Sequence, residues 1–386
     1  MATGDKLVTL DGLKVVYDHM QYAISPSSPQ GIVRTLRSGG TVPGGTTFTV
    51  PHAVYGNITF VVRAQNMHKL AADPTTPTVT IQPLYLLSVN GGTSAATFQY
   101  DRPEAFKSIS EAVPAGTVCK FTTITYGSWV AGTYHFTATD GLAVGNKLCI
   151  NGYQNTALDS LSVQVFASAK ATSASATYAI ASGEGGATVD LGTWGTDCNH
   201  PQRVSYGSNN EAQSNFFQFL NADTGNAYMD SVFEAKTEWD MMDASFTSKK
   251  GFLGGFSDEF RSYLGLCAIP NITNTVFETN GYSANGGAYT HNGYFFLPSR
   301  KEIYGSNETA GEADETQFNY YKYIATTDAD KLMYARGAAS PTTYWLRTPG
   351  AGSAFNVRIC YTGYGGALNY NLANLCYGAA PLAILA

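Results

Sequence analysis

The chain has 386 residues, a length that predicts about two to four domains. Apolar residues make up 44% of it and charged residues only 13%, a composition that supports folded cores and argues against a disordered chain. The net charge is −6 and no run of Lys or Arg occurs, so neither nucleic acid nor an anionic membrane is an expected partner. No stretch approaches about 20 apolar residues and the first residues carry no basic segment before an apolar run, so we expect neither a membrane-spanning helix nor a secretory signal.

Residues 1–25 are predicted to form an N-terminal assembly helix. Apolar residues such as Leu10 and Leu13 recur at helical spacing over residues 7–22. A helix this short is marginal alone, so it needs neighbours. Those neighbours are either other copies of this chain or another part of the same chain, and both interpretations stay open. The Ser- and Pro-rich residues 24–31 are interpreted as a linker.

Two β-rich modules are expected next. The first covers residues 26–100, and the second, which is sandwich-like, covers residues 101–195. Both contain short segments rich in β-branched and aromatic residues, which is typical of strands. The expected strands are 47–50, 58–62 and 78–82 in the first module and 121–126, 132–137 and 162–166 in the second. The isolated His52, His68 and His135 are assigned ordinary structural roles.

Residues 196–386 differ in character and predict an α+β domain. The apolar face of Asn215–Leu220 indicates one helix. Ser257–Gly265 has a Ser cap, early acidic residues and a terminal Gly, which indicate a second. Ser299–Glu302 has the Ser-x-x-Glu pattern of a capping box, which predicts the start of a third.

The last part of this domain is unusual in composition. Residues 349–386 contain one charged residue, Arg358, and no Lys, Glu, Gln, Met or Trp, although these five types fill 47 positions of the whole chain. Codons that end in a pyrimidine cannot encode any of the five. Replacement of the first two bases of an Asn codon would therefore produce the observed mixture of Asn and unrelated neighbours. Within residues 351–377, the Asn residues interpreted as unchanged codons are Asn356, Asn369, Asn371 and Asn374.

Four motifs follow one another in this domain: Phe295–Gly305, Tyr344–Pro349, Asn356-Val357 and Gly378–Leu382. Together they resemble the variable proteins of diversity-generating retroelements, in the group with a C-type-lectin fold of the formylglycine-generating-enzyme subtype. The resemblance covers about half of the chain. The opening residues and the β-rich modules are more loosely similar to structural proteins of phages of gut bacteria.

The resemblance implies a multidomain fold, with an N-terminal helix and β-sandwich-like modules followed by a C-type-lectin-like variable domain over residues 196–386. It implies that the domain displays rewritten side chains as a hypervariable ligand-binding surface, without catalysis, cofactor or metal. The expected role is that of a bacteriophage receptor-binding protein in a tail fibre, with a host-cell surface protein or glycan as ligand. Expected partners are further copies of the chain in a trimer and other virion proteins at the N-terminus. The bacterial cytoplasm or cell surface is the alternative location to the virion.

The residues expected to bind the ligand are the replaced ones, here called the variable set. Aromatic and Arg side chains among them are the expected anchors, because they provide most of the binding energy of many interfaces. An exposed position can accept many residue types at little cost in stability, so the buried scaffold has to be supplied by others, with Trp345, Leu346, Leu382 and Ile384 as candidates. Leu368 suits either role. The variable set is Phe355, Arg358, Cys360, Tyr361, Tyr364, Leu368, Tyr370, Leu372, Leu375, Cys376 and Tyr377.

Other interpretations of the domain are weaker. A formylglycine-generating enzyme would need a cysteine pair, and only Cys360 and Cys376 offer one. A calcium-dependent lectin would need clustered oxygen ligands, whereas Asp314, Glu315, Asp328 and Asp330 are interpreted as solvated loop charges. Zinc ligation by Cys198, His200, Cys267 and His291 matches no standard spacing. The six cysteines, including Cys119 and Cys149, form no CxxC pair and are interpreted as reduced thiols, with one or two disulfides as the alternative. A virion decoration protein without a ligand also stays open.

Overall fold

The structure is a computed structural model. It describes residues 27–101, 107–123, 132–151, 162–167, 174–194, 209–222, 251–272, 276–278, 281–283, 288–308, 316–350, 356–373 and 375–386. The predicted assembly helix and several residues discussed above lie outside the described residues. These are Cys198, His200, Asp314, Glu315, Phe355 and Asn374.

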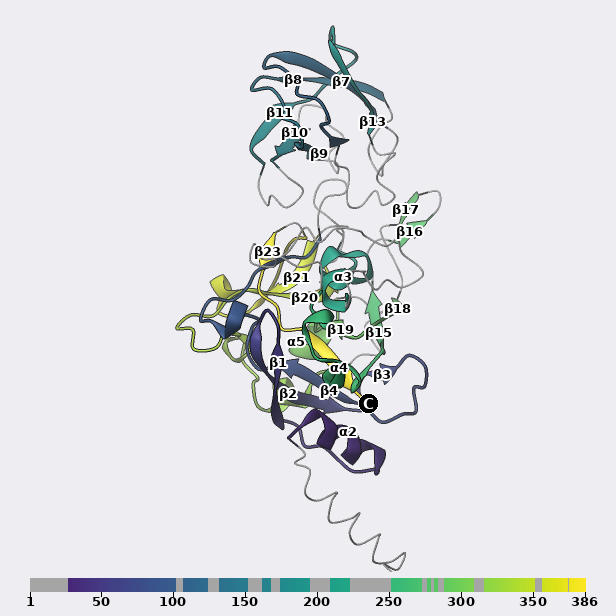
Figure 1. Cartoon of the computed structure of the whole chain (residues 1–386), viewed down its shortest axis with the longest axis vertical. Coiled ribbons are helices and arrows are strands. Elements are labelled where there is room, and N and C mark those ends of the chain that lie inside the picture. Colours follow the sequence, from purple (N-terminus) through teal and green to yellow (C-terminus); the bar gives the residue numbers. More distant parts are fainter. Residues whose placement is uncertain are drawn as a thin grey trace, which may run out of the picture.

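The largest sheet joins strands from both ends of the chain (Figure 1). Its order is β1 (Thr47–His52), β2 (Gly56–Gln65), β4 (Val79–Pro83), β24 (Leu382–Leu385) and β14 (Leu264–Gly265), and β19 (Phe295–Phe296) also pairs with β24. Buried and exposed residues alternate along β1, whereas every residue of β4 and β24 is buried. The outer strand therefore has one solvated face, and the central strands are covered on both faces.

The predicted boundary between residues 26–100 and residues 196–386 is wrong, because these two segments form one domain. Strand β4 pairs with β24, and β5 (Phe98–Gln99) pairs with β23 (Cys376–Tyr377). Strand β3 (Lys69–Leu70) pairs with β15 (Cys267–Ile272), which also pairs with β18 (Ala288–Gly293). The first core of the molecule contains side chains from both segments, for example Phe60, Phe98 and Trp345. Neither segment can complete its sheet or its core alone.

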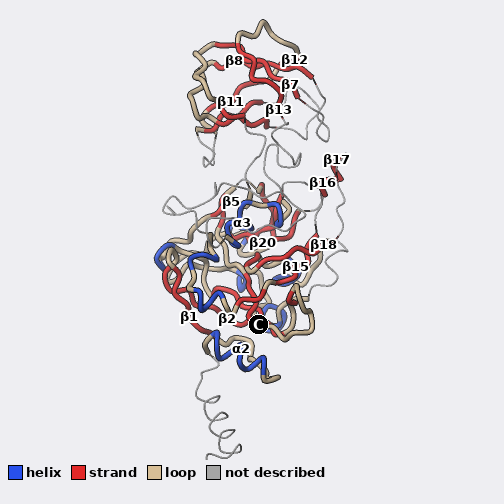
Figure 2. Tube along the Cα trace, turned by 45° about the vertical axis from the view of Figure 1, so that its right-hand side comes forward, coloured by secondary structure: helices blue, strands red, loops and turns tan. Residues whose placement is uncertain are grey.

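Residues 107–194 form an inserted module with a core of its own. One sheet has the order β11 (Ala176–Ala179), β10 (Ser162–Phe166), β9 (Lys147–Asn151), β6 (Lys107–Ser108). The other has the order β12 (Ala181–Ser182), β8 (Gly132–Ala138), β7 (Thr117–Thr123), β13 (Val189–Trp194). A cluster of buried residues that includes Phe121, Phe136 and Val163 draws on both sheets. Figures 1 and 2 show the module at one end of the molecule.

Five short helices are described, three of them as the sequence predicted. They are α2 (Pro29–Arg37), α3 (Asn215–Asn221), α4 (Asp258–Arg261), α5 (Arg300–Tyr304) and α6 (Asn319–Tyr323). Ser299 and Glu302 form the capping box of α5, and Ser257 caps α4, which is shorter than predicted. Helix α2 corrects the prediction of a linker over 24–31 followed by strands. Ser28 accepts a hydrogen bond from the backbone N–H of Gly31, and Pro29 occupies the first turn, where it costs no hydrogen bond.

A three-stranded sheet separates two cores at the C-terminal end of the sequence. It consists of β20 (Tyr344–Pro349), β21 (Asn356–Cys360) and β22 (Leu368–Leu372). Trp345, Val357 and Ile359 belong to the first core, whereas Tyr344, Leu346 and Cys360 belong to a second core that includes Phe296 and Ile303. The four predicted scaffold residues, Trp345, Leu346, Leu382 and Ile384, are all fully buried, which confirms that prediction.

Smaller elements complete the described chain. Strands β16 (Val276–Glu278) and β17 (Gly281–Ser283) form a hairpin. The short 3₁₀ helices are η1 (Val89–Gly91), η4 (Glu211–Gln213), η5 (Leu253–Gly255), η7 (Ala329–Lys331) and η8 (Thr362–Tyr364). Within the described ranges, no helix combines the length and the apolar character needed to cross a bilayer.

A buried network of charged side chains connects helix α5 to strand β20. The Arg347 guanidinium donates to both carboxylate oxygens of Glu302, at 2.8 and 2.6 Å, and Glu302 Oε1 lies 2.8 Å from His68 Nε2. Burial alone would raise the pKa of Glu302, but the charges of Arg347 and His68 and their hydrogen bonds outweigh it and hold this pKa well below its usual range. His68 therefore has a structural role, though it is not isolated.

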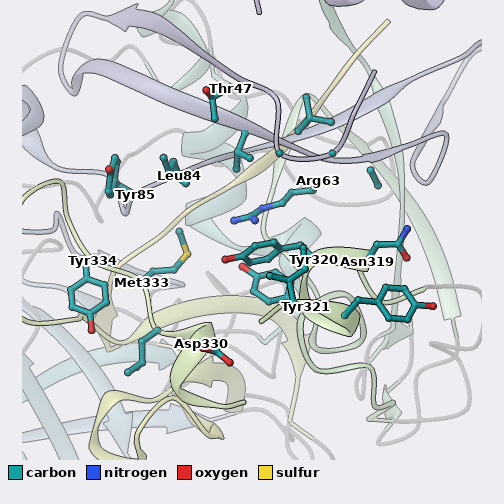
Figure 3. A pocket seen from close by; sticks show the side chains of 18 of the residues that line it. Thr47, Arg63, Leu84, Tyr85, Asn319, Tyr320, Tyr321, Asp330, Met333 and Tyr334 are labelled. Carbon is teal, nitrogen blue, oxygen red and sulfur yellow. The ribbon is translucent and has the colours of Figure 1, made fainter. Parts of the chain in front are cut away.

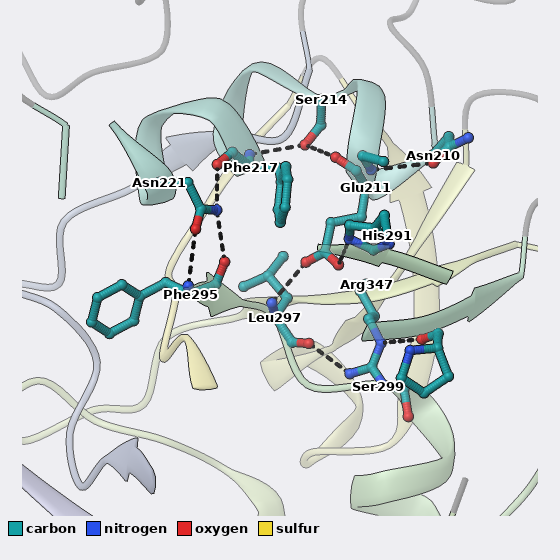
Figure 4. Close-up of polar contacts among 12 residues, drawn as sticks. Asn210, Glu211, Ser214, Phe217, Asn221, His291, Phe295, Leu297, Ser299 and Arg347 are labelled. Carbon is teal, nitrogen blue, oxygen red and sulfur yellow. Dashed lines mark hydrogen bonds and ion pairs between the residues drawn. The ribbon is translucent and has the colours of Figure 1, made fainter. Parts of the chain in front are cut away.

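A second buried carboxylate, that of Glu211, lies near this network (Figure 4). Glu211 accepts a hydrogen bond from the backbone N–H of Leu297 at 2.7 Å, and His291 Nε2 lies 3.2 Å from its other oxygen. Arg347 Nη1 also donates to the Leu297 carbonyl at 2.8 Å. Glu211 and Arg347 thus both hold the backbone of Leu297, which precedes α5.

Candidate ligand-binding surface

The register of β21 and β22 decides which members of the variable set can be exposed. Arg358 lies opposite Tyr370, and Val357 lies opposite Asn371. Paired residues of an antiparallel sheet point to the same side, and neighbours along a strand point to opposite sides. Because Val357 and Ile359 enter the first core, Arg358 and Tyr370 point to the other face.

Two tyrosines of the variable set are clearly exposed. Tyr370 on β22 is 51% exposed, and Tyr364 in η8 is 67% exposed. The Tyr361 ring packs edge-on against that of Tyr364, with centroids 5.1 Å apart, and its inner side touches the first core. Exposed tyrosines in fixed positions are effective anchors because the large ring loses little conformational freedom on binding.

The turn between these tyrosines depends on one glycine. Gly366 has a φ of +94°, and a Cβ at this position would lie 2.0 Å from the carbonyl oxygen of Asp328. The Gly366 carbonyl also accepts a hydrogen bond from the Tyr304 hydroxyl at 2.6 Å. No other residue type fits here, so the turn that presents Tyr364 is part of the scaffold.

Arg358 is held by an acidic residue that the sequence did not single out. Its Nε and Nη2 donate to the two carboxylate oxygens of Glu308 at 2.7 and 2.6 Å, and its guanidinium lies 5.2 Å from the Tyr370 ring centroid. Glu308 is buried and also binds Arg300. Arg358 is therefore partly exposed, and it packs against the Tyr370 ring while it binds Glu308. Only the tertiary structure brings Glu308 close to it, and no local pattern indicates the pair.

Tyr377 joins this surface to the first core. Its ring packs edge-on against Trp345, with centroids 4.8 Å apart, and its hydroxyl accepts a hydrogen bond from the Asn371 side chain at 2.5 Å. Leu372, Leu375 and Cys376 are half-buried. Burial raises the pKa of the Cys376 thiol to about 11. These residues can contribute an edge to a contact surface but are not freely exposed.

Cys360 does not belong to the exposed surface, which corrects its place in the variable set. It is fully buried, and its Sγ lies within hydrogen-bond distance of the carbonyl oxygens of Lys331 and Gly366, at 3.5 and 3.4 Å. Leu368, which pairs with it on β22, is half-buried and packs against the second core. The second core therefore covers this end of the face, and both residues act as scaffold. Phe355 lies outside the described residues.

Cys360 and Cys376, the two cysteines considered as a pair, lie in different parts of the domain. Cys360 lies inside the second core, and Cys376 lies on β23, beside β5; both are free thiols. Cys267 is buried in the second core, and His291 faces Glu211. Among the residues that the structure describes, no cluster of three or more His, Cys, Asp or Glu could hold a metal ion.

The chain is similar to one protein family by sequence. A family model described as a domain of unknown function, DUF6273, matches residues 197–386. No curated protein and no solved structure matches the chain. The matched segment holds all of the variable set, but the domain also needs the preceding strands β1, β2 and β4 to complete its sheet.

Proposed function

We propose that this protein is a hypervariable ligand-binding display protein, diversified by a retroelement, that attaches a bacteriophage to its host. The C-type-lectin-like nature of the domain is part of this proposal. The observation that carries it is the division of side chains on β21 and β22. Val357 and Ile359 hold the fold, while Tyr364 and Tyr370 reach solvent from the same segment.

This division is what a diversified surface requires. Substitutions of exposed side chains usually change stability by about 0.5 kcal/mol or less, whereas truncation of a buried aliphatic side chain costs about 2–5 kcal/mol. A segment that alternates between the two can accept new side chains outside without losing its core. Residues 351–377 contain no Lys, Glu, Gln, Met or Trp, the residue types that pyrimidine-ending codons cannot encode, which agrees with such replacement.

The ligand in this proposal is a protein or glycan of the host-cell surface. Tyr361, Tyr364, Tyr370 and Tyr377 combine an apolar ring with a hydroxyl, and Arg358 adds a cation beside Tyr370. Several weak sites in a trimer would gain strongly through avidity if their geometry allowed simultaneous binding. The proposed location is the phage tail, with other virion proteins bound at the N-terminus; the bacterial cell surface or cytoplasm is the alternative.

A pair of substitution libraries tests the proposal. One library places pyrimidine-ending random codons at 361, 364, 370, 372, 375 and 377, and the matched library places them at the buried positions 357, 359, 360 and 373. We expect most members of the first library to fold and most of the second to fail, judged by protease resistance of the displayed protein. Selection on bacterial cells should then enrich members of the first library.

Two results would overturn the proposal. The first is equal loss of folding in both libraries, because the surface would then not be free to vary. The second is a folded first library that no cell surface enriches while the unaltered virion attaches normally. That second result would favour a decoration protein without a ligand.

A further inference from the structure

A second concave site lies on the scaffold, away from the variable set. It is a cleft of about 860 Å³ between β2, the residues that follow β4, helix α6 and the segment 330–338 (Figure 3). This volume is within the range of sites that hold small ligands, about 300–1,000 Å³. Among the described residues that line it, none belongs to the variable set. We call it the tyrosine cleft.

Most of the large apolar side chains that are exposed among the described residues line the tyrosine cleft. Of the nine large apolar side chains that are exposed in the described chain, six line it. Exposed apolar patches of this kind mark binding sites more often than chance. Four of the six are tyrosines, so the walls offer both flat apolar rings and hydroxyl groups. The six are Leu84, Tyr85, Tyr320, Tyr323, Ile324 and Tyr334.

A buried arginine supplies positive charge to the cleft. Arg63 on β2 is only 8% exposed. Its Nε donates to the Gln82 side chain at 2.8 Å, and its guanidinium lies 4.9 Å from the ring centroid of Tyr320 and 5.3 Å from that of Tyr321. No carboxylate of the described residues forms an ion pair with it. The rings and Gln82 fix the guanidinium, and its amino groups remain as donors toward the cleft, as Figure 3 shows.

The side chains that line the cleft favour one chemical class of ligand. An arginine fixed by stacking binds a carboxylate through two parallel hydrogen bonds better than any other side chain. Burial of the Arg63 charge without a counter-ion costs free energy, and an anionic ligand would offset that cost. Tyrosine rings beside it suit the C–H face of a sugar ring, and their hydroxyls suit its hydroxyls.

We propose that the tyrosine cleft binds an acidic saccharide, with a uronic-acid carboxylate on Arg63 and the sugar ring against Tyr320. This is a constant site, independent of the variable surface, and it does not rest on the function proposed above.

Calorimetric titration of the full chain with a trisaccharide of galacturonic acid tests the proposal. The galactose trisaccharide of the same linkage and a tripeptide of glutamic acid serve as comparison ligands. We expect binding of the acidic sugar and at least about tenfold weaker binding of the neutral one, since a charge-assisted pair contributes about 1.5–3 kcal/mol. The peptide has carboxylates but no sugar ring to pack against Tyr320, so it should also bind more weakly than the acidic sugar. Arg63→Gln should reduce the affinity at least about tenfold, and Arg63→Lys should restore part of it.

Substitutions of exposed residues test the site with little effect on folding. Tyr320→Ala and Tyr334→Ala should retain the thermal midpoint of the unaltered protein and still weaken binding several-fold. Arg37→Gln and Val144→Ala, which change an exposed arginine and an exposed apolar residue elsewhere, should leave binding unchanged. Absence of binding, equal binding of the neutral sugar, equal binding of the peptide, or full binding by both tyrosine variants would each contradict the proposal.

Discussion

The ion pair between Arg358 and Glu308 tests whether position 358 can vary, as proposed above, although its side chain makes a structural contact. Glu308 is 1% exposed and binds two guanidinium groups, those of Arg300 and Arg358. Arg300 lies in helix α5, outside residues 351–377. If position 358 varies, Arg300 must be able to neutralise Glu308 alone.

The expected energies follow from what each substitution leaves behind. Arg358→Ala removes two charge-assisted hydrogen bonds but keeps Arg300 beside the carboxylate, so we expect a loss of about 1–2 kcal/mol in the free energy of unfolding. The double variant Arg300→Ala/Arg358→Ala leaves a buried carboxylate without a counter-charge and should cost about 3–5 kcal/mol. Glu308→Gln in that double background should recover part of the loss, because a neutral amide needs no counter-charge.

Urea unfolding followed by circular dichroism measures these differences, provided that the unfolding slope stays constant across the variants. The decisive comparison is between Arg358→Ala and the double variant. If the single substitution costs as much as the double one, Arg300 does not compensate, and position 358 belongs to the scaffold. The variable set would then lose its one cation.

Three further outcomes are expected. Ile359→Ala should cost about 2–5 kcal/mol in the free energy of unfolding and Tyr364→Ala within about 0.5 kcal/mol, and equal costs in urea titrations would contradict the assigned faces. Because the pKa of Glu302 is lowered in the folded state, its contribution should be complete above pH 4.5 and be lost as the pH falls below it; unfolding measured from pH 6 to pH 3 should therefore show a steeper loss than the Glu302→Gln variant does. Mass-spectrometric mapping should find maleimide on Cys376 before Cys360, and the reverse order would place Cys360 outside the core.

Local features of this fold could be predicted from the sequence because neighbouring residues determine them. The Ser299–Glu302 capping box predicts α5, and β-branched runs predict β1, β2 and β4. Helix α2 had an equally local signal, the Ser28-Pro29 start, which a Ser- and Pro-rich linker resembles in composition. The backbone N–H of Gly31 donates to the Ser28 side chain and caps the first turn of α2. This hydrogen bond distinguishes the helix from a linker.

Long-range pairing could not be predicted in the same way. Strand β4 mixes apolar residues with Thr80 and Gln82, whereas β24 is a short apolar run, and nothing in either indicates that residues 79–83 and 382–385 lie side by side. The prediction of a separate module over residues 26–100 failed for this reason. The same limit applies to the site. Alternation on β22 predicts that Tyr370 and Asn371 face opposite ways, but only the position of the second core shows that Cys360 and Leu368 are covered.

The central claim is that exposed side chains of residues 351–377 are exchanged while the buried ones are kept. Sequencing of this region in sister copies from one phage or bacterial population, together with the flanking DNA, tests it most directly. The account predicts differences at the codons for 364 and 370, constant codons for 357, 359 and 366, and an adenine-richer near-copy of the region beside a reverse transcriptase gene. Substitutions spread evenly over buried and exposed positions, with no such near-copy, would contradict it.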